Sequence, residues 1–202
     1  MGKPVIGITT YLVPAAWGAW NMETALVPAD YVRAVAAAGG APVLIPPGAS
    51  LPETLSLVDG LDEPFLVMNG DILTALDYRA MYDAHRREGR IATLAVFPRA
   101  VKLDLGVVRF DENGVLTEYL EKPTHDYWVS MGVYVFDPRV REHIAPGERL
   151  DLPDLLQRLQ GRGETVRCHV YRDYWLDIGR VEDYQQAVAD FERIRERLLP
   201  PE

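Results

Sequence analysis

The stretch PFLVMNGDIL, residues 64–73, decides the fold prediction. Its apolar run from Phe65 to Met68 stops at an asparagine and a glycine, and the charged Asp71 follows. Such a run is typical of a buried strand, and ligands of open α/β sheets bind beyond the carboxyl ends of these strands. We therefore expect Asp71 at the rim of a sheet. Position alone favours equally a metal ligand and a cap for the next turn.

Strand and helix patterns alternate around this stretch. Apolar strands are predicted at residues 5–8, 42–45, 65–68 and 91–97, and helices at residues 28–38, 52–58 and 77–88. This order predicts the α/β class, with a mostly parallel Rossmann-like sheet and helices on both faces. Residues 11–24 and 46–50 show the least pattern.

The C-terminal half adds an antiparallel region. Residues 105–110 and 115–121 flank Asp111-Glu112-Asn113-Gly114, and an Asn-Gly pair supplies the positive φ angles that a tight hairpin turn requires. Further strands are predicted at residues 128–136 and 165–171, and helices at residues 138–144, 152–159 and 180–199.

The composition is that of a globular protein. The chain has 202 residues, 48% of them hydrophobic and 25% charged, which is enough to bury a core. Its formal net charge of −9 argues against a nucleic-acid partner. The single cysteine, Cys168, excludes an internal disulfide, and the sequence shows neither a signal-peptide pattern nor a membrane-spanning run. We expect a cytoplasmic protein with no nucleic-acid or membrane partner, and the sequence leaves the oligomeric state open.

Two further places carry candidate functional side chains. Asp177 lies in the aromatic segment YWLDIG, where a carboxylate needs a cation or hydrogen-bond donors; alone, it is better explained as the cap of the following helix. Glu121 and Lys122 end the second hairpin strand at Pro123. Lys122 is suited to a phosphate and Glu121 to hydroxyl groups, although such a dipeptide is usually a surface ion pair.

From about residue 62 to residue 200, the chain resembles the sugar nucleotidyltransferases, which include mannose-1-phosphate guanylyltransferases and glucose-1-phosphate thymidylyltransferases. The resemblance is carried by FLVMNGDIL, DLGVVRFDENGVLTEYLEKP, WVSMGVYVF, LDLPDLLQRL and YWLDIGRVEDY. These enzymes join a sugar 1-phosphate to the α-phosphate of a nucleoside triphosphate and release pyrophosphate. The resemblance implies Mg²⁺ as cofactor and a sugar 1-phosphate or nucleotide sugar as ligand.

The same resemblance assigns roles to individual residues. Asp71 and Asp177 resemble the family's Mg²⁺ ligands. Glu121 resembles the acceptor for sugar hydroxyls, and Lys122 resembles the clamp on the sugar phosphate. The backbone positions that line the sugar pocket correspond to Gly106 and Val129. The family often has Asn where this chain has Ser130, so the sugar stays unidentified.

One part of the family's site has no match. The family holds the triphosphate in a glycine-rich N-terminal loop, G-G-x-G-T-R-L, which is followed by a lysine. Here the first predicted strand runs instead into ITTYL, residues 8–12. Because phosphoryl-type transfer depends on positioning and electrostatics, we expect the transfer to be impaired or absent.

The N-terminal segment, KPVIGITTYLVPAAWGAWNMETALVPADYVRAVAAAGGAPVLIPP, resembles the opening of γ-glutamyl-γ-aminobutyrate hydrolases in the class I glutamine amidotransferase-like group. The likeness runs to about residue 61. That group uses a cysteine on a strand-to-helix elbow and a later His-Glu pair. Cys168 lies instead in the alternating RCHV stretch, and its neighbour His169 would face the other side of a strand. Amide hydrolysis is therefore the weakest of the functional hypotheses.

The sequence thus predicts a composite chain. Residues 1–61 form an amidotransferase-like βαβα segment and residues 62–202 a nucleotidyltransferase-like sugar-phosphate half, and we expect both in one continuous sheet. Whether the chain is an enzyme stays open. Three hypotheses remain: an active sugar-1-phosphate nucleotidyltransferase, a sugar-phosphate-binding module without turnover, and a natural or engineered recombinant α/β scaffold with no selected activity.

Overall fold

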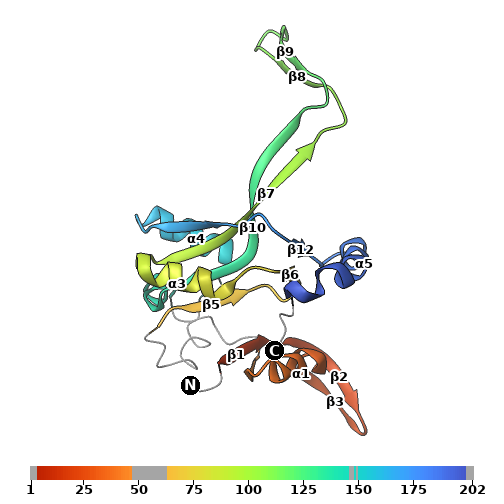
Figure 1. Ribbon diagram of the computed structural model, residues 1–202, viewed down its shortest axis with the longest axis vertical. Helices are drawn as coiled ribbons and strands as arrows, with labels where there is room; N and C mark the ends of the chain where they lie inside the picture. Colours follow the sequence, from red (N-terminus) through yellow and green to blue (C-terminus); the bar gives the residue numbers. More distant parts are fainter. Residues whose placement is uncertain (1–3, 47–62, 146–147, 149, 199–202) are drawn as a thin grey trace. The chain divides into compact units, whose positions relative to one another are not determined.

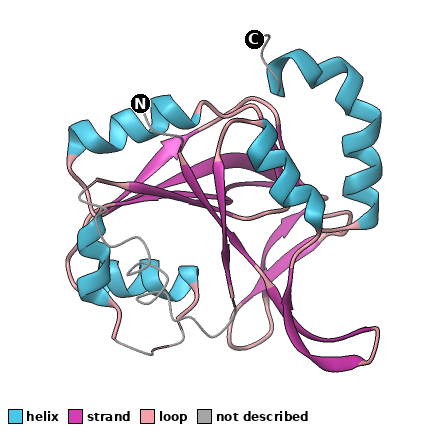
Figure 2. Ribbon diagram, turned by 90° about the horizontal axis from the view of Figure 1, so that it is seen from below, coloured by secondary structure: helices cyan, strands magenta, loops and turns pink. Residues whose placement is uncertain are grey.

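The computed structural model describes residues 4–46, 63–145, 148 and 150–198 (Figure 1). The chain divides into two compact units. Unit 1 comprises Met1–Leu61 with Arg141–Arg158, and unit 2 comprises Asp62–Val140 with Leu159–Glu202. Helices and strands occur together throughout, as an α/β class requires (Figure 2). The helix predicted at residues 52–58 lies outside the described residues.

Unit 1 contains a parallel βαβ motif. Strands β1 (Val5–Thr9) and β4 (Ala41–Ile45) pair in parallel, and the connection between them includes helix α1 (Ala29–Ala37). Helix α1 ends where the Gly40 N–H donates to the Val35 carbonyl, 3.0 Å away. The predicted strands and helix of this segment are therefore observed.

The structure corrects one expectation for this segment. Residues 11–24, which show little pattern, belong to an antiparallel hairpin of strands β2 (Tyr11–Trp17) and β3 (Trp20–Leu26). Its two-residue turn begins at Gly18, whose φ of 58° suits the tight turns that join such strands. Among the described strands, β1 and β4 hydrogen-bond only to each other, so each satisfies its ladder within its own two-stranded sheet.

Unit 2 is built on a four-stranded sheet with the order β11-β7-β10-β5. Its strands are β5 (Phe65–Met68), β7 (Ala92–Lys102), β10 (Thr124–Phe136) and β11 (Val166–Val170). Strand β10 runs antiparallel to β5 and β7, and β11 runs parallel to β7. Three of the four strands therefore point the same way, but β10 lies between two of them, so the sheet is mixed, with one parallel and two antiparallel pairings.

The core of unit 2 lies at the inner end of this sheet. Residues 131–136 of β10 are all buried, as expected for a central strand with neighbours on both sides. The largest fully buried side chain is Phe136, whose ring lies 5.9 Å from those of Phe65 and Tyr134. Met81 and Met131 are also fully buried and belong to a cluster with Val133 and Val135, which alternate with Tyr134 and Phe136 along β10.

The helices begin and end as their sequences predict. Helix α3 (Tyr78–Glu88) begins where the Asp77 carboxylate accepts from the Ala80 N–H, 2.9 Å away, and ends at Gly89, with a left-handed φ of 60°. Within the described residues, the other helices are the 3₁₀ turn η1 (Pro138–His143), α4 (Leu152–Gly161) and α5 (Val181–Leu198). No helix in the described part of the chain is both long and apolar enough to cross a membrane.

Strands β7 and β10 continue well beyond the sheet and form a two-stranded arm (Figure 1). At its tip are β8 (Val107–Phe110) and β9 (Leu116–Leu120), which pair as the predicted antiparallel hairpin. The Asp111 carboxylate accepts from the N–H groups of Asn113 and Val115, and Gly114 has a φ of 80°, so the turn forms where the sequence places it. Residues 105–122 are called the ribbon below.

A short two-stranded sheet closes the other end of unit 2. Strands β6 (Ile72–Thr74) and β12 (Trp175–Asp177) are three residues each and pair antiparallel, with Asp177 opposite Ile72. The Thr74 hydroxyl also donates to the Tyr174 carbonyl, 2.9 Å away. This pairing brings residues about a hundred positions apart into contact and sets up the site described next.

Candidate functional site

Asp71 and Asp177 lie together at the junction of β5, β6 and β12. The Ile178 N–H donates to the Asp71 carbonyl at 2.8 Å, which fixes the two segments against each other. A Cβ placed on Gly179 would lie 3.2 Å from the Asp177 Oδ1 atom and 3.3 Å from the Asp71 Oδ2 atom. One oxygen of each carboxylate therefore borders the same small space beside Gly179, and the Asp177 Oδ1 atom also accepts a hydrogen bond from the Gly179 N–H at 3.0 Å.

A β-bulge in β10 holds the loop before Asp71. The register shifts between Ser130 and Tyr134, and Gly132 within the bulge has a φ of 72°. The Asn69 N–H donates to the Gly132 carbonyl at 2.9 Å, and a Cβ on Gly132 would lie 2.7 Å from the Asn69 Nδ2 atom. The bulge thus sets the position of the turn that delivers Asp71.

The bulge is itself fixed by polar contacts. The Gly132 N–H donates to the Ser130 hydroxyl at 3.2 Å, and that hydroxyl lies 3.1 Å from the Tyr134 hydroxyl. The Trp175 indole N–H donates to the Met131 carbonyl at 3.2 Å, and its ring packs on Phe97 with centroids 5.3 Å apart. Val129, one residue before the last regular pair at Ser130, is half-buried opposite Phe97.

The donor set suits a hard divalent cation. Mg²⁺ usually takes one or two carboxylates and completes its shell with water and phosphate oxygens. No cluster of three or more His, Cys, Asp or Glu side chains suited to a metal occurs among residues 4–46, 63–145, 148 and 150–198. Two exposed, converging carboxylates fit Mg²⁺ shared with a phosphate, and they do not fit a metal that the protein encloses by itself.

The remaining predicted residues lie on the ribbon. A Cβ on Gly106 would lie 2.3 Å from the Tyr119 hydroxyl oxygen, and that hydroxyl donates to the Glu121 carboxylate at 2.9 Å. Lys122 has a φ of 45°, a left-handed conformation that strains any residue other than glycine, and such strain concentrates at functional sites. These residues therefore form their own cluster.

The structure does not bring this cluster to the carboxylates of the same chain. Lys122 precedes Gly132, the contact of Asn69, by ten positions, and nearly all of them are extended in β10. At a rise of roughly 3.3 Å per residue, Lys122 lies on the order of 30 Å along the strand from the bulge. The arm in Figure 1 shows this separation.

The comparison with protein families gives the deciding observation. The sequence model of the family described as nucleotidyl transferase matches residues 51–194, which is well over half of the chain. The chain belongs to the nucleotidyl transferase family. A second family, described as Peptidase C26, matches residues 4–72. Both resemblances read from the sequence are therefore confirmed, and the two matches overlap across the start of unit 2.

Curated members of the nucleotidyl transferase family are similar over much of this chain. A UTP–glucose-1-phosphate uridylyltransferase from Synechocystis is 33% identical over 179 residues, which are 84% of this chain and 43% of that protein. The catalytic subunit beta of a mannose-1-phosphate guanylyltransferase from Drosophila pseudoobscura is 27% identical over 64% of this chain and 35% of that protein. The chain thus spans less than half the length of either relative.

Solved structures of similar proteins support the fold. A Bacillus anthracis protein assigned as a glucose-1-phosphate thymidylyltransferase aligns with a TM-score of 0.54 at 18% identity, over 79% of this chain and 70% of that one. HddC from Yersinia pseudotuberculosis aligns with a TM-score of 0.53 at 19% identity, over 81% of this chain and 74% of that one. At these identities, the likeness establishes the α/β fold of the nucleotidyl transferase chain.

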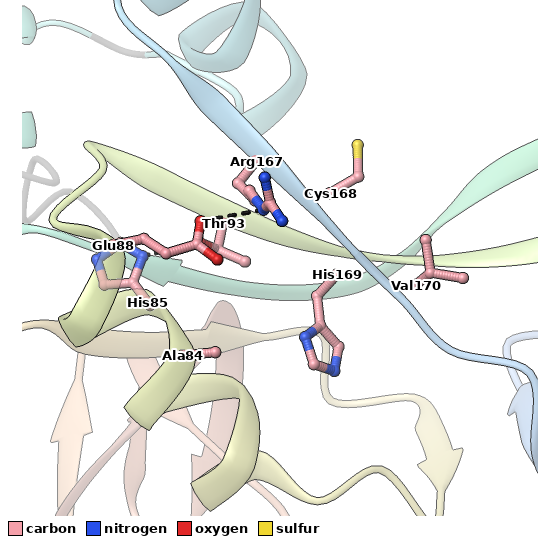
Figure 3. A pocket seen from close by; sticks show the side chains of 8 residues that line it. All are labelled: Ala84, His85, Glu88, Thr93, Arg167, Cys168, His169 and Val170. Carbon is pink, nitrogen blue, oxygen red and sulfur yellow. Dashed lines mark hydrogen bonds and ion pairs between the residues drawn. The ribbon is translucent and has the colours of Figure 1, made fainter.

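A separate pocket of about 250 Å³ lies between α3 and the edge strand β11, away from the carboxylate pair (Figure 3). Glu88 and Arg167 form an ion pair of 3.0 Å along its wall. Cys168 and His169 project to opposite sides of β11, and Cys168 is exposed in a regular strand without the elbow of an amidotransferase nucleophile. This geometry gives no support to amide hydrolysis.

The same pocket contains a buried histidine that makes folding sensitive to acid. The His85 side chain is buried, its Nδ1 atom lies 2.9 Å from the Thr93 hydroxyl, and its Nε2 atom has no hydrogen-bond partner within the described structure. Burial lowers the pKa of His85 below its ordinary value of 6.5, and the charges of Asp137 and Glu88 offset this only in part.

Acidification is therefore expected to destabilise the protein through His85. Above pH 6.5 the His85 ring is mainly neutral in the folded and the unfolded protein. Below that value the unfolded chain binds a proton at His85 more readily than the folded chain does, so the free energy of unfolding falls. The measurement is the free energy of unfolding from pH 7.5 to 5.5 in the wild type, His85→Gln and, as control, His125→Gln on the arm. If the free energy of unfolding of His85→Gln falls with pH as steeply as that of the wild type, His85 is not the cause of the acid sensitivity.

Three residues of the site are absent from the sequence-based set: Asn69, Gly132 and Gly179. The sequence offers a local signal for each of them, which is a glycine next to or near a residue of the site. The three stretches are NGD at residues 69–71, MG at residues 131–132 and DIG at residues 177–179. What the sequence does not reveal is that Gly132 contacts Asn69 and that Gly179 leaves room between two carboxylates.

Proposed function

We propose that this chain binds Mg²⁺ through Asp71 and Asp177 and uses that site to hold the phosphate of a sugar 1-phosphate or nucleotide sugar. The observation that carries the proposal is the convergence of the two carboxylates on the space over Gly179. Asp71 follows β5, at the end of the four-stranded sheet where ligands of open α/β sheets bind, and Asp177 is the last residue of β12. A bound Mg²⁺ would offset the negative charge of the phosphate.

Each residue of the site has a defined task in this proposal. Asp71 and Asp177 supply the anionic oxygens, and the hydrogen bond from Ile178 to Asp71 holds them in register. Asn69 and Gly132 fix the turn that carries Asp71. The Gly179 N–H donates to the Asp177 carboxylate at 3.0 Å, and the absence of a side chain at Gly179 leaves the space beside both carboxylates empty of protein atoms. These tasks amount to binding and orientation.

We further propose that these 202 residues bind without nucleotidyl transfer. The triphosphate of such a reaction needs a cradle of N–H groups and cations, and the G-G-x-G-T-R-L loop has no match in the sequence. Two assays separate the hypotheses. A melt with Mg²⁺ and a panel of sugar 1-phosphates and nucleotide sugars should show a cooperative transition raised by one of them, and pyrophosphate release from added triphosphates should be absent.

The two alternatives give different results in these assays. Sustained pyrophosphate release that depends on a sugar 1-phosphate would establish an active transferase and overturn the binding-only proposal. A cooperative transition that no ligand of the panel moves would leave a folded scaffold and overturn the proposed site. The expected stabilisation is about 2.7 kcal/mol at a ligand concentration of roughly a hundred times the Kd.

Removing one carboxylate is expected to abolish the ligand-dependent part of this stabilisation. In Asp71→Asn or Asp177→Asn, the remaining carboxylate binds Mg²⁺ too weakly to hold a phosphate, so the shift of about 2.7 kcal/mol should disappear while the ligand-free melt changes little. The control is Asp126→Asn, which removes an exposed carboxylate from the arm. An Asp177→Asn protein that keeps the full shift would exclude Asp177 from the site.

A further inference from the structure

The β2–β3 hairpin of unit 1 carries an apolar face that is exposed to solvent. Cross-strand partners share a face of a hairpin and successive residues alternate between its two faces, so the register of β2 and β3 defines each face. One face carries the side chains of Tyr11, Val13, Ala15, Trp20, Met22 and Leu26. Apart from the alanine, each of these is between 37% and 66% exposed. This set is called the hairpin face below.

The hairpin lacks the support of a larger sheet. Within the described part of the chain, β2 and β3 hydrogen-bond only to each other, and the tip of the hairpin extends beyond β1 and α1 (Figure 1). An isolated two-stranded hairpin is marginally stable in water, and contiguous exposed apolar surface marks an interaction site. The hairpin face is therefore suited to contact with another surface.

The chemistry of the hairpin face selects an apolar protein partner. Alternation places Glu23 on the opposite face, and residues 11–26 contain no Lys or Arg. The Thr24 hydroxyl donates to the Met22 carbonyl at 3.1 Å, so it needs no partner from outside. A membrane surface attracts such elements partly through basic residues, and a charged protein partner needs complementary charges. The hairpin face offers neither, and it matches a surface that is as apolar as itself.

We propose that this surface is the hairpin face of a second copy, so that two hairpins pack face to face about a two-fold axis. The inference is independent of the proposed function. A two-fold contact uses the same patch on both copies and therefore requires a self-complementary surface. An apolar patch without charge meets this requirement, because it opposes no like charges when it meets itself.

The sizes of the side chains also fit this arrangement. The bulky Tyr11 and Trp20 stand at the two ends of the hairpin face. The small Ala15 and Thr24 lie between them, and both are half-buried. A tryptophan that packs over small residues of the partner is the kind of anchor that interfaces favour. The Trp20 ring of each copy can take this role on the other copy.

The exposed area is sufficient for such a dimer. The five large side chains of the hairpin face present on the order of 600 Å² per copy, so two copies would bury roughly 1,200 Å², the lower limit for stable interfaces. Contact through the face is also favoured over addition of a strand to the edge. Pro14 lies within β2 and lacks an N–H, which makes this edge a poor template for a further strand.

The first test is the oligomeric state of the full chain. Sedimentation is expected to show a dimer for the wild type and a monomer for Trp20→Ser/Met22→Ser, which removes apolar contact from the hairpin face. The matched control is Leu12→Ser/Ala25→Ser, a cross-strand pair on the opposite face, and it should remain a dimer. A monomeric wild type, or a dimer that Trp20→Ser/Met22→Ser leaves intact, overturns the proposal.

The second test locates the contact and does not depend on how well the double variant folds. In a Cys168→Ser background, Met22→Cys places a thiol on the hairpin face, and Glu23→Cys places one on the opposite face of the same strand. A short bismaleimide should link the Met22→Cys protein into covalent dimers in much higher yield than the Glu23→Cys protein. Equal yields would show that two copies do not meet through the hairpin face, and the proposal would fail.

The third test separates a second copy from a lipid surface. The wild type is mixed with phosphatidylcholine vesicles and centrifuged through a density gradient. A dimer that buries its hairpin faces should stay at the bottom of the gradient. A wild type that is monomeric in sedimentation and floats with the vesicles, while Trp20→Ser/Met22→Ser does not float, would identify a lipid surface as the partner and overturn the proposal.

Discussion

Phe136→Ala is expected to cost about 3–5 kcal/mol of unfolding free energy, the largest stability effect among the substitutions considered. Phe136 is buried to within 1% of full burial, and its ring contacts those of Phe65 on β5 and Tyr134 on β10. Its removal opens a cavity at the pairing of β5 with β10, where the rigid sheet cannot close around it. Since small domains are stable by about 5–15 kcal/mol, this loss brings the protein close to unfolding.

Denaturant titration measures this effect. The midpoint should fall for Phe136→Ala with an unchanged slope, because the surface exposed on unfolding stays nearly the same. Tyr127→Ala, which removes an exposed aromatic ring from the arm, is the control and should cost less than about 1 kcal/mol. Equal losses for the two variants would mean that the inner end of β10 is not the core of unit 2.

Gly132→Ala is expected to abolish the ligand-dependent shift while the protein still folds. A φ of 72° costs a non-glycine residue roughly 1–3 kcal/mol, and the new Cβ would lie 2.7 Å from the Asn69 side chain. Asn69 must move, and it is hydrogen-bonded to Gly132 two residues before Asp71. The carboxylate pair then loses its geometry, so the melting temperature should drop and should no longer respond to Mg²⁺ with sugar phosphates.

The matched control separates backbone strain from displacement of the site. Gly163 has a φ of 81°, and a Cβ there would meet no atom within 4 Å, so Gly163→Ala carries the strain alone. It should lower the melting temperature by a similar strain cost and keep the full ligand response. A Gly132→Ala protein that retains the response would show that the bulge does not position Asp71.

Local patterns predicted the order of elements in unit 2 well. Helix α3 is bounded by Asp77 and Gly89, and the β8–β9 turn contains Asn113-Gly114, so the signals lie within a few residues of the structure that they specify. The hairpin at residues 11–26 escaped prediction because Pro14 and a run of small residues obscure its alternation. Strands β6 and β12 escaped because three residues are too few to show a period.

The candidate site was predictable residue by residue but not as an arrangement. Asp71 and Asp177 are recognisable at the ends of apolar segments, whereas their convergence depends on a strand pairing between residues about a hundred positions apart. The reach of β7 and β10 was underestimated because the apolar runs stop near Phe97 and Trp128, where the strands leave the core but keep hydrogen-bonding to each other. That reach sets the distance between Lys122 and the carboxylates.

Gly179 also bears on how this lineage of sequences can change. A methyl group there would lie 3.2 Å and 3.3 Å from the two carboxylate oxygens and would occupy the space they share. One nucleotide change in a glycine codon is enough to introduce alanine. The mutated gene would still encode Asp71 and Asp177. The presence of Asp71 and Asp177 in a related sequence is thus not enough to indicate a working site. In a related sequence where Gly179 is replaced, we expect the site to be lost even though both acids are kept.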